Sequence, residues 1–294
     1  MQFSIRNIKL QARKALKGRW FQPIWLLVTS FLLVQLLGSL LSSGLGQNSF
    51  IETLLFMLLN YFLLFSFKYG QYYYPNSVFA EQPFRFSMLF IGLSPLYYKR
   101  FVILNFIESV LLMLRTWLIF IPFIGSLSLL DMLQINYGMS SVKLLTRIET
   151  IIAHFDVWHL TGLILLLVLA GILWLWLNGF FQIAAYLVFE NGQNSRARIL
   201  SATLLFMHHH WLDLLKLQLS FIGWYLFFPV TFLWLIPYRQ MAIFIFYVSI
   251  KHEFMAKLAQ VQADQAETLA RIQRLQKDHD EAAEDDNDQD HSKE

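Results

Sequence analysis

Long apolar runs without charged residues alternate along this chain with short polar segments. The longest run, residues 160–189, has thirty residues and no Asp, Glu, Lys or Arg. Because an α-helix rises about 1.5 Å per residue, roughly 20 apolar residues cross the hydrocarbon core of a bilayer. Lipid offers no partner to open backbone N–H and C=O groups, so such runs cross it as complete helices. The pattern predicts an all-α, polytopic membrane protein.

Residues 23–253 are predicted to form a transmembrane domain of about six spans. The last two spans come from one apolar stretch, Leu217–Ile250, which is too long for a single crossing. Pro229 supplies a tight reversal, whereas a reversal at Pro237 would leave a final helix too short to cross. The thirty-residue span would reach roughly 45 Å, so we expect tilt, protrusion or a break near Asn178 and Gly179. The predicted spans are 24–41, 51–69, 101–125, 160–189, 212–228 and 231–252.

Residues 1–22 predict a basic amphipathic helix on the membrane surface. The apolar residues that recur at helical spacing are Ile5, Ile8, Ala12, Ala15 and Leu16, and Trp20 follows at the entry to the first span. A basic helix of this kind lies in the interface and attracts anionic lipids. A plain positive anchor without a lipid-binding role stays the alternative. The candidate anionic-lipid contacts are Arg13, Lys14, Lys17 and Arg19.

The distribution of basic residues predicts the orientation of the spans. The loop after the second predicted span holds four basic residues and only one acid, Glu81; the four are Lys68, Arg85, Lys99 and Arg100. Basic loops stay in the cytoplasm. We therefore expect a multi-pass protein of the cell membrane with both termini in the cytoplasm. The loop 42–49 and the segment 126–158, with a helix on the surface, would then lie outside.

After the last predicted span the chain becomes polar. Residues 254–277 predict an exposed cytoplasmic helix, and a coiled coil is the alternative, although Gln265 and Thr268 interrupt its apolar register. Residues 278–294 hold nine of the 20 acids. Such a segment cannot bury apolar surface sufficient to offset the entropy of ordering, so we predict a disordered acidic tail.

The composition excludes several functional classes. Charged residues make up 15% of the chain, against about 25% in soluble domains. The absence of cysteine excludes disulfides, thiolate nucleophiles and cysteine metal sites. Consecutive helical residues point about 100° apart, so His208–His210 cannot converge on one metal ion without ligands from elsewhere in the chain. Without a phosphate loop or a nucleophile motif, we predict no enzyme and no cofactor. The scattered basic residues do not indicate nucleic acid.

Three charged residues inside the predicted spans form a candidate intramembrane polar site. Glu108 and Arg115 lie seven residues apart, on one face of the third span, and Arg239 follows Pro237 in the sixth. Charges at membrane depth are costly and usually face the bundle interior or a water-filled cavity. Arg239 would then pair with Glu108, or bind a lipid phosphate or a carboxylate. The alternatives are a structural pair and side chains that reach the interface.

Two stretches resemble a known family. Residues 12–20, Ala-Arg-Lys-Ala-Leu-Lys-Gly-Arg-Trp, resemble an Ala-Arg-x-Ala-Leu-Lys-Gly-Asn-Trp opening, and residues 217–224 with 233–238 and Phe246-Tyr247 form the second likeness. Both are similar to the membrane proteins of Gram-positive bacteria in domain-of-unknown-function family 975. Gly192 departs from the usual Pro, and residues 126–158 look like an insertion. The resemblance implies about six helical spans and no reaction.

Two functional hypotheses follow. The first is a non-enzymatic membrane protein that interacts with the lipid bilayer, with anionic lipids or with a membrane protein partner. The second is a transporter or channel for a small or lipid-like solute, motivated by the three intramembrane charges. Transporters often contain repeated halves with matched broken helices. The sequence has no convincing internal repeat, so we favour the first hypothesis. The oligomeric state is not predicted.

Overall fold

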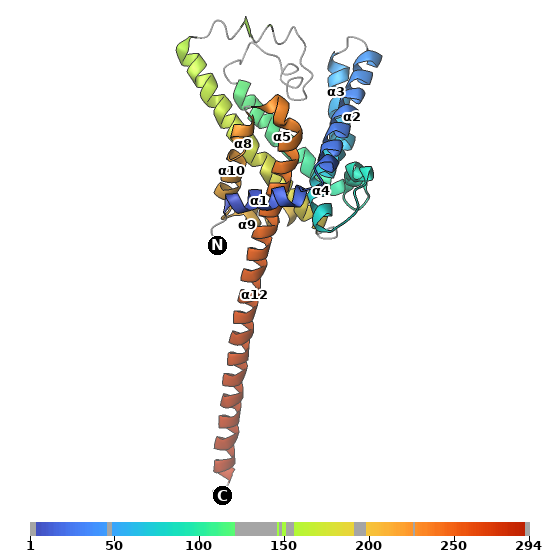
Figure 1. Ribbon diagram of the computed structural model, residues 1–294. Coiled ribbons are helices and arrows are strands. Elements are labelled where there is room, and N and C mark those ends of the chain that lie inside the picture. The colour runs from blue at the N-terminus through green and yellow to red at the C-terminus, as the bar shows by residue number, and fades with distance from the viewer. Residues whose placement is uncertain are drawn as a thin grey trace. The chain divides into compact units, whose positions relative to one another are not determined.

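The computed structural model describes residues 4–45, 49–120, 146, 149–150, 156–190, 198–225 and 227–291. Over these ranges the chain is helical and has no strand, as Figure 1 shows. The chain is therefore an all-α polytopic membrane protein, as predicted. Its elements are α1 (Ile5–Leu16), α2 (Phe21–Leu45), α3 (Ser49–Leu59), the π-helical turn η1 (Asn60–Leu64), α4 (Phe65–Phe79), the 3₁₀-helix η2 (Phe86–Leu93), α5 (Tyr98–Phe120), α8 (Val157–Glu190), α9 (Arg198–Met207), α10 (Trp211–Leu219), α11 (Ile222–Tyr225) and α12 (Phe228–His291).

Five of the described helical segments are long and apolar enough to cross a membrane. They are Phe21–Leu41, Thr53–Phe79, Tyr98–Ile119, Val157–Glu190 and Thr231–Ala266. The fifth predicted span, 212–228, is not one continuous helix. Helix α10 ends at Leu219 and α11 has four residues. The break is stabilised locally, because the Lys9 ammonium donates to the carbonyl of Ser220 at 2.7 Å and so satisfies a carbonyl at the helix end.

Helix α12 settles the position of the last reversal. It begins at Phe228 and contains Pro237 in its interior, so the chain reverses before the helix and not at Pro237. The chain divides into two compact units, Met1–Tyr247 and Val248–Glu294. In the second unit the helix continues to His291, where the composition predicted a disordered tail after residue 277. Its Ala-, Gln- and Glu-rich sequence favours a helix, and Lys257 pairs with Glu253 one turn earlier at 2.7 Å.

The second span is longer than predicted and places Lys68 inside the bundle. Helices α3 and α4, joined by η1, run to Phe79, so Lys68 is not a loop residue. Close backbone contact holds α4 against η2: a Cβ at Gly70 would lie 2.5 Å from the Cα of Leu89. Beside it, the Ser66 hydroxyl donates to the Leu89 carbonyl at 2.8 Å. Glycine is therefore required at residue 70 to fit the two elements together.

Helix α8 runs without a break through Asn178 and Gly179, although a break there was one expectation from its length. Its start is capped by Asp156, whose carboxylate accepts from the N–H of His159 at 2.9 Å. Gly179 serves packing instead. A Cβ there would clash with the Gln218 side-chain nitrogen, which donates to the Leu175 carbonyl at 2.6 Å. The small residue thus admits α10 to the surface of α8.

Several predicted features fall outside the described residues. These are the end of the third span after residue 120, nearly all of the external segment 126–158, and the surface helix expected in that segment. Helix α9 ends at Met207 and α10 begins at Trp211. A turn at His208–His210 separates the two.

Candidate functional site

Helix α1 packs on the protein through its apolar face. Ile8, Ala12 and Leu16 expose 5%, 0% and 0% of their surface, and the helix lies across the direction of α2 and α8 in Figure 1. The amphipathic pattern therefore positions α1 on the helical body, whereas the sequence suggested a face in the bilayer. The helix ends where Gly18 adopts a φ of +76°, a left-handed conformation that glycine adopts without strain.

Polar contacts through Lys9 fix α1 in this position. Its ammonium donates to the Ser220 carbonyl and lies 4.3 Å from the ring centre of Phe221. Its backbone carbonyl accepts from the Tyr238 hydroxyl at 3.1 Å. Burial lowers the pKa of Lys9. One residue of α1 thus joins the helix to the segment after α10 and to α12.

The four candidate lipid contacts lie on the outside of this anchored segment. Arg13, Lys14, Lys17 and Arg19 are exposed. In the part of the chain that the structure describes, none of the four forms an ion pair with an acidic side chain. Their charges therefore face the surroundings of the protein.

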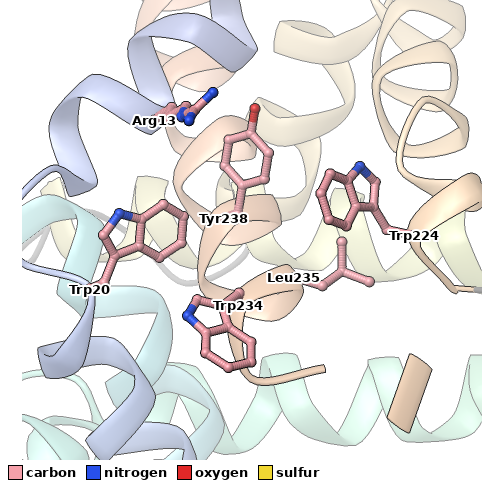
Figure 2. A pocket seen from close by; sticks show the side chains of 6 residues that line it. All are labelled: Arg13, Trp20, Trp224, Trp234, Leu235 and Tyr238. Carbon is pink, nitrogen blue, oxygen red and sulfur yellow. The ribbon is translucent and has the colours of Figure 1, made fainter. Parts of the chain in front are cut away.

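A cavity of about 350 Å³ lies beside Arg13, as Figure 2 shows. Arg13 comes from α1, Trp20 from the turn after it, and Trp224 from α11. In this view the Arg13 side chain and the Tyr238 hydroxyl lie at one end, and Trp234 lies at the other. The full lining is Arg13, Trp20, Trp224, Trp234, Leu235 and Tyr238. Sequence reasoning placed Trp20 at the membrane surface but missed the cavity, because its walls come from segments two hundred residues apart.

The lining of the cavity is aromatic, with one charge. Leu235 is 2% exposed, whereas Trp224 and Trp234 expose 52% and 51% of their surface. Trp20 and Tyr238 are in ring contact, with centroids 6.2 Å apart. Ligand sites in proteins are mostly apolar, with a small number of placed polar groups. The arrangement suits an amphiphile with an apolar body and a negatively charged end.

The structure does not bring the three predicted intramembrane charges together. Glu108 is 2% exposed and pairs with Lys68, with Oε2 and Nζ 2.5 Å apart. Arg115 donates to the neighbouring Thr116 hydroxyl at 3.3 Å. The predicted pair of Arg239 and Glu108 is therefore wrong. Lys68 is the partner that sequence reasoning missed, because it was counted with the basic loop after the second predicted span.

Arg239 is buried among neutral polar groups. It is 6% exposed, and its guanidinium donates to the Tyr225 hydroxyl and to the side-chain oxygen of Asn178, both at 2.9 Å. The same group lies 5.7 Å from the ring centre of Trp174. The neutral partners orient the guanidinium but do not neutralise its charge.

Neutral polar side chains link further helices of the body. The Gln182 amide donates to the Tyr186 hydroxyl, and that hydroxyl donates to the Gln240 carbonyl at 3.2 Å. The Gln240 amide donates to Gln71 at 3.4 Å, and the Gln71 amide donates to Ser30 at 2.6 Å. A search of the sequence for charged residues misses this network, because its members are neutral. The sequence feature that could have indicated it is the presence of glutamines within long apolar helices.

Comparison with known proteins gives one match. Residues 1–253 match DUF975, described as a protein of unknown function. The chain belongs to this family. No curated protein and no solved structure matches it. The matched region includes α1 and the intramembrane polar residues. It also includes the cavity lined by Trp20, Trp224 and Trp234, which we call the tryptophan cavity. It ends near the division between the two compact units at residue 247.

The described residues give no indication of a metal centre. They contain no group of three or more His, Cys, Asp or Glu side chains arranged to hold an ion. His208 and His209 contact each other through their rings, with ring nitrogens 3.3 Å apart, and His210 lies 3.8 Å from Asp213. These contacts place the three histidines in a turn between α9 and α10. The family assignment adds no metal or cofactor to this arrangement.

Proposed function

We propose that this protein is a non-enzymatic component of the bacterial cell membrane that binds anionic phospholipids at the cytoplasmic surface through α1. The main support for this proposal is that the apolar face of α1 is buried on the helical body, whereas its basic residues are exposed. These residues are Arg13, Lys14, Lys17 and Arg19. A helix held in this way presents its charges without having to enter the bilayer itself. We propose binding and not a reaction because the sequence holds no recognisable catalytic motif.

Electrostatics supports the proposed surface. Anionic lipids attract each Lys or Arg near the cytoplasmic leaflet by about 1 kcal/mol, and the attraction decays within a Debye length. Several exposed charges on one short helix act on the same patch of lipid. Arg85, in the loop before η2, and Lys99, in the first turn of α5, are both exposed and favour the same cytoplasmic side for this surface. The N-terminus, and α1 with it, is then cytoplasmic.

The test measures lipid selectivity in nanodiscs. The full chain is reconstituted in mixtures of phosphatidylglycerol and phosphatidylcholine, and quenching of tryptophan fluorescence by brominated forms of each lipid reports which lipid is enriched around the protein. We expect enrichment of phosphatidylglycerol that weakens with salt. Replacing Arg13, Lys14 and Lys17 with Gln should remove most of it.

A control of equal charge change lies outside the family region. Replacing Lys257, Arg271 and Arg274 with Gln removes three positive charges from the second compact unit. This control should keep the enrichment of phosphatidylglycerol. Equal selectivity in the α1 variant and the unmodified chain would overturn the proposal.

A second candidate function, passage of a small anionic solute, is favoured by Arg239. Its Nε is buried and has no hydrogen-bond partner in the described residues, and its partners Asn178 and Tyr225 are neutral. A buried cation without a carboxylate attracts an anion. Flux of a carboxylate or phosphate solute into liposomes that Arg239→Gln abolishes, and that Arg239→Lys partly retains, would favour transport. Equal flux with empty liposomes would exclude that solute.

A further inference from the structure

We infer that the tryptophan cavity holds one acyl chain of an anionic phospholipid whose phosphate is bound by Arg13. This inference rests on the proposed function and deepens it, because it assigns one defined lipid site beside a surface of general lipid attraction. Three observations support the inference: the cavity, the exposed aromatic rings, and the position of one cation at the end of the cavity.

The size and lining of the cavity suit a hydrocarbon chain. Its volume of about 350 Å³ lies near the lower end of the roughly 300–1,000 Å³ of ligand sites. A site of this size accommodates one chain better than a complete two-chain lipid. Leu235 is almost fully buried, and aromatic rings form the remaining apolar walls. A small inorganic anion would leave these walls without a partner.

The exposed tryptophans show where the chain would enter. Trp224 and Trp234 line the cavity and still expose about half of their surface, 52% and 51%. Both belong to the transmembrane region, in or beside the span Thr231–Ala266. Exposed indole rings of a membrane protein lie against lipid, most often near the headgroups. The cavity wall is thus continuous with a surface that lipid covers.

Arg13 is the cation positioned for the phosphate. It lies at the end of the cavity opposite Trp234 in Figure 2 and is exposed. The neighbouring ammonium of Lys9 already donates to the Ser220 carbonyl, and the Tyr238 hydroxyl donates to the Lys9 carbonyl. A planar guanidinium binds phosphate oxygens through two parallel N–H groups. The chain of a lipid held at Arg13 can therefore follow the cavity towards Trp234.

The experiment counts lipids that stay bound after extraction. The full chain is purified in mild detergent from membranes with phosphatidylglycerol and phosphatidylcholine, and native mass spectrometry records the retained lipid. We expect one retained phosphatidylglycerol per chain. Trp234→Ala should lower its occupancy about tenfold, and Arg13→Gln should bring retention of the two lipids to within about twofold of each other. Trp117→Ala, which removes a 44% exposed tryptophan of α5 outside the cavity, should change nothing.

Three results would overturn the inference. The first is no retained lipid on the unmodified chain. The second is equal loss in Trp117→Ala and Trp234→Ala when both variants melt at the same temperature. The third is displacement of the lipid by inorganic phosphate or glycerol phosphate at equal concentration, since the ligand would then be the free anion. The double variant Lys14→Gln, Lys17→Gln distinguishes the lipid site in the cavity from the general lipid surface of α1. It should weaken the enrichment of phosphatidylglycerol in nanodiscs and leave the retained lipid in place.

Discussion

The carboxylate of Glu108 on α5 meets the ammonium of Lys68 on α4 inside the helical body. The two atoms are 2.5 Å apart, Glu108 is almost fully buried and the Lys68 side chain is 31% exposed. Removing one partner of a buried pair leaves an uncompensated charge, which is costly, whereas replacing both with apolar groups is often neutral. The pair therefore contributes more to the specificity with which α4 and α5 pack together than to the net free energy of unfolding.

This asymmetry gives the first prediction. Lys68→Met should lower the free energy of unfolding by about 3 kcal/mol, because it leaves the Glu108 carboxylate buried without its cation. Adding Glu108→Leu should recover most of the loss. Thermal melting in detergent, followed by loss of soluble protein, measures both. If the double variant melts no higher than the single one, the pair contributes through something other than charge compensation.

Close helix approach gives the second prediction. Gly70→Ala should destabilise the protein severely, by about 3 kcal/mol or more, because the new methyl group meets the backbone of Leu89 and the Met88 carbonyl, which cannot move independently of η2. Gly179→Ala should cost less, about 1–2 kcal/mol, because it displaces the flexible end of Gln218 from the Leu175 carbonyl.

Two glycines of α8 provide the matched control. Nothing lies within 4 Å of a Cβ built at Gly162 or Gly171, so alanine there should be neutral or should stabilise the helix slightly. Melting temperatures of the four variants form one series. A loss at Gly162 as large as that at Gly70 would show that the effect is not due to steric contact.

The apolar runs determine the fold, and much of it could be predicted from them. Five of the six predicted spans correspond to helices long enough to cross a membrane, since hydropathy over about 20 residues reports a constraint on backbone hydrogen bonding. The failure at 212–228 has a cause outside that stretch of sequence. The chain breaks after Leu219, where Lys9 from the N-terminal helix satisfies a carbonyl, and no pattern within residues 212–228 contains that information.

The candidate site was predictable only where it lies on one helix. The exposed basic residues of α1 follow from the spacing of Ile8, Ala12 and Leu16, which are buried as a set. The cavity and the pair of Lys68 with Glu108 depend on contacts between distant segments. A single sequence gives the face of each helix but not the partner of that face. The sequence therefore indicated that Glu108 and Arg239 are intramembrane charges, but the pairing of the two that it suggested is wrong.

The third prediction concerns pH and the start of α8. Hydrogen bonding from the backbone N–H of His159, and next from its ring, lowers the pKa of Asp156 below its ordinary value of 3.8. A carboxyl whose folded pKa is depressed stabilises the fold above its unfolded pKa, and this contribution is lost as pH falls through the folded pKa. We therefore expect the melting temperature to decrease more steeply below about pH 4 in the unmodified chain than in Asp156→Asn, which keeps an oxygen for the cap at every pH. Parallel pH profiles of the two proteins would contradict a capping role.

The last prediction tests the orientation on which the lipid proposal depends. Without Lys68, the loop between the second and third spans keeps Arg85, and Lys99 and Arg100 lie in the first turn of α5. Together they are still an excess of positive charge over Glu81. Because the chain has no cysteine, single cysteines report accessibility without background. Cysteine at the exposed Gln82 should react with an impermeant thiol reagent only after the cells are opened, and cysteine at the exposed Ser43, just after the first span ends at Leu41, should react in intact cells. Labelling of Gln82→Cys in sealed cells would place α1 on the outer face, away from the anionic cytoplasmic leaflet, and the proposed lipid surface would lose its partner.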